Sequence, residues 1–141
     1  MFKRILLPVD IVKNSNKSIE YTIQTAKNFN SEVLIIHAFA IPLPEYIPFN
    51  FDTKELEEQI FNDCNKIVAE VENRFKGADI KVKSFLKNGP AGFMIIRIVE
   101  SEGCDLVIMQ SRSKTDQKNF LIGSVSNYVI HHTKIPVLLI H

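Results

Sequence analysis

The order of apolar and amphipathic segments predicts an α/β protein with a doubly wound, mostly parallel sheet. Short apolar runs alternate along the chain with segments in which apolar residues recur every three or four positions. Continuous apolar runs are typical of strands covered on both faces, and the longer period is typical of amphipathic helices. Alternation over short connections favours right-handed crossovers, which place helices on both faces of a parallel sheet. The 141 residues suffice for one such domain.

Five apolar runs are predicted to be strands. They lie at residues 5–9, 32–38, 80–85, 105–109 and 136–140. The third run alternates apolar and polar residues, so we expect it to be half exposed near an edge of the sheet. The fifth begins with Pro136, a position at which the missing N–H of a proline does least harm.

The first two predicted helices lie between the first three strands. The apolar residues of the first helix are Ile19, Ile23 and Ala26. Asn14 or Ser15 is expected to cap its start, because such side chains accept hydrogen bonds from the free N–H groups of a helix. The second helix carries an apolar stripe over residues 56–75, and Gly77 is its predicted stop.

The last two predicted helices are shorter. One carries an apolar stripe over residues 94–99, which follows Gly89-Pro90 and ends near Gly103. The other begins at Gly123-Ser124, and its stripe consists of Val125, Tyr128, Val129 and His132. Two connections are longer than usual, at residues 39–49 and 110–119.

Composition excludes several classes of protein. Lys and Arg number 17 and Asp and Glu 16, so the formal charge of +1 offers no basic excess for general nucleic-acid binding. No apolar run approaches the ~20 residues of a membrane span, and the first residues do not form a secretory signal. Cys64 and Cys104 have no CxxC or metal-ligand spacing and are expected to be buried thiols. These points predict a cytoplasmic protein that binds neither nucleic acid nor membrane.

The carboxyl ends of the strands are where a ligand is expected. Doubly wound sheets bind ligands there, at the point where the strand order reverses. The candidates are Asp10, the polar loop after Met109, and the turn at Gly123-Ser124, where the free N–H groups of a helix start favour an anion. Asp10 could instead cap the following turn, and Gly123 could be an ordinary helix start. Neither a P-loop motif nor GxGxxG occurs, which disfavours P-loop and classical dinucleotide folds.

Three segments together resemble a known family. They are Pro8-Val9-Asp10, His37-Ala38, and Gly123-Ser124-Val125 ahead of the apolar run 135–140. This constellation is similar to the universal stress protein (UspA) family, and the resemblance covers the whole chain. It implies a single domain over residues 1–141 with the adenine nucleotide alpha hydrolase-like fold. That fold is a doubly wound open sheet of five parallel strands in the order 3-2-1-4-5, with helices on both faces.

The resemblance also implies an adenine-nucleotide site, for ATP or AMP with Mg²⁺, in the crevice between the first and fourth strands. Nucleotide-binding members carry G-x2-G-x9-G-[ST] after the fourth strand, and here Gln110 and Ser113 stand at the first two glycine positions. A Gln110 side chain would occupy space near the ribose or phosphates unless it turns outward, and Ser113 lacks the backbone freedom of glycine. The expected site is therefore degenerate. Its residues by resemblance are Pro8, Val9, Asp10, Ala38, Met109, Gln110, Ser113, Gly123, Ser124, Val125 and Ser126.

The family divides the roles of these residues. Asp10 is expected to bond the ribose or a metal-bound phosphate. Val9, Ala38 and Met109 are expected to line the adenine pocket, although Val9 and Met109 are equally suited to the core. The backbone N–H and hydroxyl groups of five residues are expected to hold the ribose and phosphates: Ser113, Gly123, Ser124, Val125 and Ser126.

Two surfaces are candidate interfaces. A hydrophobic strand at a sheet edge pairs with other chains unless it is covered, and family members commonly pair through strand five, so we expect a homodimer. Its residues are Pro136, Val137, Leu138, Leu139 and Ile140. The 39–49 loop contains Ile41, Leu43, Tyr46, Ile47 and Phe49 with three prolines. It could cover the sheet as a lid, bind a partner protein, or fold back on its own helix.

The resemblance implies a non-enzymatic, dimeric stress-response or regulatory protein. One alternative is a family member that binds no nucleotide and acts through protein contacts, and another is a nucleotide hydrolase of related architecture. No Ser-His-Asp or Cys-His arrangement can be proposed from the sequence, so neither catalytic nor metal-binding residues are predicted. His37, at the end of a buried strand, is expected to be a packed and hydrogen-bonded core residue.

Overall fold

The strands form one parallel sheet with the first strand at its centre. The computed structural model describes residues 1–10, 12–41, 53–111 and 123–141. Its strands are β1 (Arg4–Pro8), β2 (Glu32–Phe39), β3 (Val82–Asn88), β4 (Leu106–Gln110) and β5 (Val137–Ile140). They lie in the order β3-β2-β1-β4-β5, and every pairing is parallel. The predicted fold class and strand order are confirmed.

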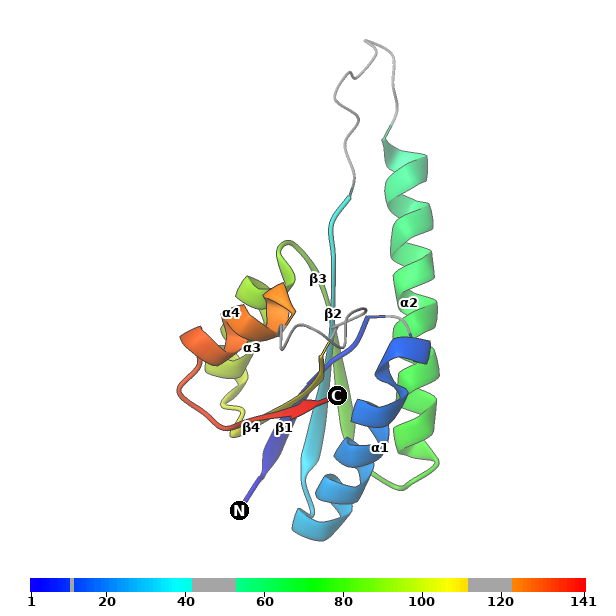
Figure 1. Cartoon of the computed structure of the whole chain (residues 1–141). Coiled ribbons are helices and arrows are strands. Elements are labelled where there is room, and N and C mark those ends of the chain that lie inside the picture. Colours follow the sequence, from blue (N-terminus) through cyan, green and yellow to red (C-terminus); the bar gives the residue numbers. More distant parts are fainter. Residues whose placement is uncertain (11, 42–52, 112–122) are drawn as a thin grey trace.

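Helices cover both faces of this sheet. They are α1 (Val12–Phe29), α2 (Lys54–Lys76), α3 (Ala91–Glu102) and α4 (Ser124–His132). The first two pack on one face, and α3 and α4 pack on the other (Figure 1). Among the described residues, none of these helices is long and apolar enough to cross a membrane.

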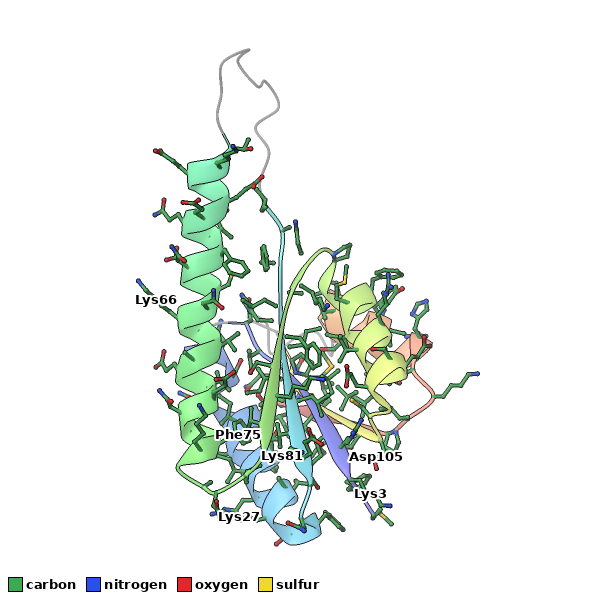
Figure 2. All side chains as sticks on the ribbon, turned by 180° about the vertical axis from the view of Figure 1, so that it is seen from behind. Lys3, Lys27, Lys66, Phe75, Lys81 and Asp105 are labelled. Atoms are coloured by element: carbon green, nitrogen blue, oxygen red, sulfur yellow. The ribbon has the colours of Figure 1, made fainter. Side chains whose placement is uncertain are left out.

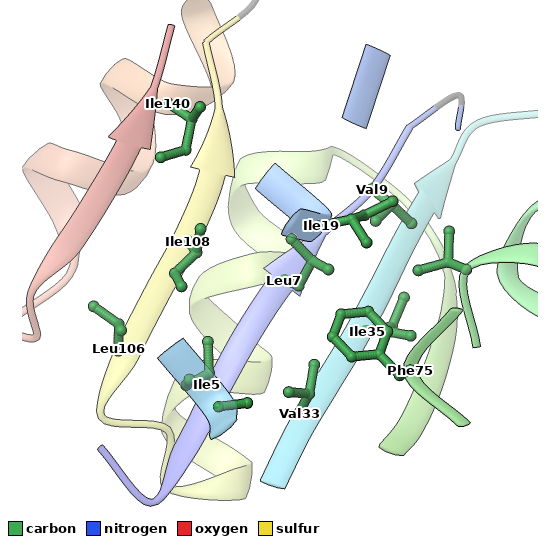
Figure 3. Packing of buried hydrophobic residues seen from close by; sticks show 12 residues of the cluster. Ile5, Leu7, Val9, Ile19, Val33, Ile35, Phe75, Leu106, Ile108 and Ile140 are labelled. Atoms are coloured by element: carbon green, nitrogen blue, oxygen red, sulfur yellow. The ribbon is translucent and has the colours of Figure 1, made fainter. Parts of the chain in front are cut away.

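Two hydrophobic clusters, one on each face, explain the continuous apolar runs. Ile5 and Leu7 of β1 are fully buried against α1 and α2, whereas Leu6 is fully buried on the α3 and α4 side. Successive side chains of a strand point to opposite faces, so both sets must be apolar when both faces are covered. Figure 3 shows the first cluster, in which Phe75 of α2 lies beside Ile35 of β2.

The sheet-facing side of α1 is unusually polar. Ser15, Ser18 and Thr22 are all buried, with at most 3% of their surface exposed. The Ser18 hydroxyl donates to the Ser15 carbonyl at 2.9 Å, and the Thr22 hydroxyl donates to the Ser18 carbonyl at 2.7 Å. These local bonds satisfy the hydroxyls inside the fold. The expectation that Asn14 or Ser15 caps α1 was wrong, because the helix begins at Val12 and both residues lie inside it.

The ends of other elements differ slightly from the prediction. β3 begins at Val82 rather than at residue 80, because the Ile80 N–H donates to the Phe75 carbonyl in the turn after α2. Pro136 lies outside β5, yet its carbonyl accepts a hydrogen bond from the Val107 N–H at 3.1 Å. Gly77 is the C-cap of α2 and Gly103 that of α3, so both helices stop where they were predicted to stop.

The amino-terminal edge of the sheet is held by one carboxylate. Asp105 accepts hydrogen bonds from the backbone N–H groups of Lys3 at 2.8 Å and Arg4 at 3.1 Å. Figure 2 places Asp105 and Lys3 together at this edge. Asp105 therefore fixes the start of β1 against the start of β4, at the edge opposite to the carboxyl ends.

Both cysteines are buried, as predicted, and both are free thiols. Burial, together with the nearby carboxylates of Glu102 and Asp105, raises the pKa of the Cys104 thiol to about 11. Burial and Asp63 also raise the pKa of Cys64.

We expect Cys104 in the folded protein to resist alkylation by iodoacetamide at pH 8, because a thiol with this pKa is only about 0.1% thiolate there. The labelling rate, followed by mass spectrometry, should rise as the pH approaches 11 and should reach that of a free thiol in denaturant. Rapid labelling of Cys104 in the native protein at pH 8 would contradict the burial described above.

The contact between α3 and α4 depends on a glycine. A Cβ atom at Gly92 would lie 2.7 Å from Cδ1 and 2.9 Å from Cγ of Tyr128. The Tyr128 ring is also stacked on His132, with 3.9 Å between the ring centroids. Because the clash involves the root of the ring rather than a flexible tip, the helices themselves would have to separate.

Gly92→Ala should lower the free energy of unfolding by about 1–2 kcal/mol, since overpacking of this kind outweighs the ~1 kcal/mol gain in helix propensity. Urea denaturation measures the change. Gly77→Ala is the matched control, because its Cβ would lie no closer than 3.5 Å to the atoms around it and its φ is −62°. Equal stabilities for the two variants would show that α3 and α4 can readjust freely.

Candidate functional site

A cavity of about 290 Å³ lies beyond the carboxyl ends of β1 and β4. These strands are neighbours, and the helices that come next in the chain, α1 and α4, pack on opposite faces of the sheet, so the strand order reverses between them. This is the position at which doubly wound sheets bind ligands. The cavity is lined by Pro8, Val9, Asp10, Asn14, Ser15, Ile36, Ala38, Ala91, Ile95, Met109, Gln110, Ser111, Gly123, Val125 and Ser126.

Most of the residues expected by resemblance meet in this cavity. They are Pro8, Val9, Asp10, Ala38, Met109, Gln110, Gly123, Val125 and Ser126. Ser124 begins α4 but does not line the cavity, and Ser113 lies outside the described residues.

The helices α1 and α3 contribute cavity residues that were not expected from the sequence. Asn14 and Ser15 come from the first turn of α1, and Ala91 and Ile95 come from the start of α3. The element order could have indicated these residues, because a helix that follows a strand in a doubly wound sheet begins at the edge where the carboxyl ends of the strands lie. Small residues in such first turns were therefore candidates for the lining.

His37 fixes the position of Val9. Its Nδ1 lies 2.8 Å from the Val9 carbonyl oxygen, and its side chain is buried. Because a carbonyl can only accept, this ring nitrogen carries the proton. The Val9 N–H donates in turn to the Ile36 carbonyl at 2.9 Å. The expectation of a packed, hydrogen-bonded core histidine is confirmed, and its effect is to hold the residue that follows β1 at the wall of the cavity.

Gln110 is turned towards α1. Its Oε1 accepts a hydrogen bond from the backbone N–H of Ser18 at 3.3 Å. Leu106 and Ile108 belong to the cluster under α1 and α2, so strand alternation places Gln110 on that same face. The side chain is only partly buried and still lines the cavity. The sequence alone did not determine whether Gln110, which replaces the first glycine of the family motif, turns into the cavity or away from it. In the structure its carbonyl end is bound to α1.

Ser111 joins the cavity to the last strand. Its N–H donates to the Ile140 carbonyl at 2.7 Å, next to the end of the chain. Its hydroxyl oxygen is buried and has no hydrogen-bond partner among the described residues. Buried hydroxyls are nearly always hydrogen-bonded in folded proteins, so this oxygen is a candidate contact for a ligand.

The cavity has an apolar side and a polar side. Ile36, Ile95 and Met109 belong to the cluster on the α3 and α4 face and form an apolar wall. Such a wall suits a planar aromatic group. Among the described lining residues, Asp10 has the one ionisable side chain, and the other polar groups are neutral hydroxyls and amides.

The start of α4 gives the site a position that favours negative charge. Gly123 is the N-cap of this helix, and no side chain caps it there. The free N–H groups and the helix dipole favour a negatively charged group at this end. Within the described residues, no group of three or more His, Cys, Asp or Glu side chains could hold a metal ion.

Comparison with known proteins gives one consistent result. Residues 1–141 match the model of the universal stress protein family. The universal stress protein MJ0577 of Methanocaldococcus jannaschii is 28% identical, and the match covers 99% of this chain and 95% of that protein. Its solved structure superposes with a TM-score of 0.83 at 26% identity and covers 99% of this chain and 96% of that one.

Two further solved structures carry ligands. A universal stress protein in complex with cAMP has a TM-score of 0.73 at 19% identity, covering 99% of this chain and 97% of that one. The universal stress protein of Archaeoglobus fulgidus in complex with dAMP has a TM-score of 0.71 at 14% identity, covering 99% of this chain and 98% of that one. At these identities both share the fold with this chain. Since the family model spans every residue of the sequence, the chain belongs to the universal stress protein family.

Proposed function

We propose that this protein binds an adenine nucleotide, AMP or ATP, in the cavity beyond β1 and β4. The proposal makes it a cytoplasmic stress-response or regulatory protein that acts by binding rather than by catalysis. The observation that carries the proposal is the combination, in one cavity at the reversal of strand order, of an apolar wall, neutral hydrogen-bonding groups and a helix start. Complexes of two proteins of the same fold with cAMP and dAMP support the same ligand class.

The apolar wall is suited to the adenine ring. Ile36, Ile95 and Met109 are buried or nearly so and would contact the faces of the base. Val9 and Ala38 lie at the carboxyl ends of two neighbouring strands and complete this side of the cavity. Binding of the base would remove apolar surface from water, which favours association.

The phosphates would lie at the start of α4. Gly123 and Ser126 line the cavity there, and no side chain caps the start of the helix. Asp10 would accept a hydrogen bond from a ribose hydroxyl. It is also the carboxylate through which Mg²⁺ could be held, since Mg²⁺ is commonly bound by one or two carboxylates together with substrate phosphates.

A specific observation favours the alternative function through protein contacts. A second cavity, of about 460 Å³, is lined by Phe39 and Ile41 of the predicted 39–49 loop together with Phe61 of α2. Glu57 and Glu58 also line it, and Phe61 is 49% exposed, so the cavity offers an aromatic side chain beside two carboxylates. The rest of that loop, including Leu43, Tyr46, Ile47 and Phe49, lies outside the described residues.

Calorimetric titration with AMP and with ATP plus Mg²⁺ tests the proposal. The wild-type protein should bind in the micromolar range. Gly123→Asp should weaken ATP binding about tenfold or more, because its carboxylate would repel the phosphates at short range. Gly123→Asn is the matched control and should bind nearly as the wild type. Asn and Asp are equally good N-cap residues and are similar in size, so the two variants differ in charge.

Three outcomes would contradict parts of this proposal. If Gly123→Asp and Gly123→Asn lose the same amount of ATP affinity, the charge at the start of α4 does not determine ATP binding. If the wild-type protein gives no heat on titration and no thermal shift, the alternative function through protein contacts is favoured. Release of phosphate from ATP above background would favour a hydrolase.

We also propose that two copies pair through β5. This strand lies at one edge of the sheet, and 38% of the Leu138 surface is exposed there. The other edge strand, β3, carries Lys83 and Lys87, which discourage pairing with another chain. β5 is uncharged along its whole length, VLLI. An isologous contact across a two-fold axis would cover both copies of the strand.

Light scattering after gel filtration should give twice the 16.1 kDa of one chain. Leu138→Lys should give a folded monomer, because a charge on the pairing strand would be buried in the contact. Phe61→Lys is the control for loss of an exposed apolar side chain and should remain a dimer. A wild-type monomer at micromolar concentration would overturn the pairing.

A further inference from the structure

The side chain that breaks the glycine motif is itself placed to bind the ligand. Gln110 accepts a hydrogen bond from the Ser18 N–H, although 92 positions separate the two residues. Because a backbone N–H is a donor, the carbonyl end of the carboxamide must face it. The orientation of the Gln110 side chain is therefore fixed, with its NH₂ group at the other end.

That NH₂ group retains its donor capacity. Among the described residues, the Ser18 N–H is the one hydrogen-bond partner of the Gln110 side chain. Gln110 is only partly buried and lines the cavity. With Oε1 occupied by α1, the Nε2 atom is the polar group that a bound molecule can contact.

The two faces of the sheet indicate which part of a nucleotide this atom would meet. The apolar wall and the start of α4 lie on the α3 and α4 face, which suits the base and the phosphates. Gln110 lies on the α1 face, next to the carboxyl end of β1 and therefore close to Val9 and Asp10. The sugar, which joins base and phosphates, is the part that reaches this side.

We infer that Gln110 is a specificity-determining residue whose Nε2 donates a hydrogen bond to a ribose hydroxyl of the bound nucleotide. This inference rests on the proposed function. A glycine at this position offers a ligand only its backbone, whereas Gln110 offers a side-chain donor held in place by α1. The site should therefore discriminate by the hydroxyls of the sugar.

Adenosine and 2′,3′-dideoxyadenosine are the probes, because neither carries a phosphate and the comparison is free of charge effects. The wild-type protein should bind adenosine more tightly than the dideoxy nucleoside. In Gln110→Met, which keeps the length of the side chain without its polar atoms, the ratio of the two affinities should fall about three- to tenfold, the range expected for one hydrogen bond. The affinity for dideoxyadenosine should change little.

Gln110→Gly is the second variant, because it differs from Gln110→Met in volume but shares the loss of Nε2. Both variants should show the lower ratio in calorimetric titration, with circular dichroism confirming that they are folded. A wild-type ratio in either folded variant would overturn the inference and leave the proposed function standing. Failure of the wild-type protein to bind either nucleoside or AMP would overturn both.

Discussion

β1 is hydrogen-bonded along both edges, and this pairing brings together the strand ends that line the cavity beyond β1 and β4. It pairs with β2 through Ile5↔Val33 and with β4 through Ile5↔Leu106. Both pairings are parallel, so the three carboxyl ends meet at one edge while α1 leaves towards one face and α4 packs on the other. The polar ends of the strands and the starts of the helices can then surround one cavity. Any slip in register would move the apolar and polar side chains to the wrong faces.

The residues that continue β1 show how this constraint reaches the site. Val9 is held by its own N–H to the Ile36 carbonyl and by His37 to its carbonyl. At the far end of the strand, Asp105 binds the N–H groups of Lys3 and Arg4. β1 is thus fixed at both ends by polar contacts and along its length by apolar ones. The hydrogen bonds of Val9 thus connect this part of the cavity wall directly to the core.

The sequence predicts the fold well, because alternation of elements and continuous apolar runs follow directly from burial on both faces. It places Asp10, Met109 and Gly123 at one edge for the same reason. What it misses depends on tertiary contacts. The first turn of α1 uses buried hydroxyls, so an apolar stripe locates the helix but not its start. The direction of Gln110 depends on Ser18, a residue far away in the sequence that no local pattern connects to it.

The two edges of the sheet are unlike each other, and this sets a limit on assembly. β3 presents lysines at its edge, whereas β5 presents an uncharged strand. On the proposed pairing, the β5 strands of two copies meet at a two-fold axis and join the two sheets into one continuous sheet of ten strands. The outermost strands of that sheet are then both β3, and their like charges oppose a third chain. A single asymmetry between two strands would thus allow association while preventing growth into a fibre.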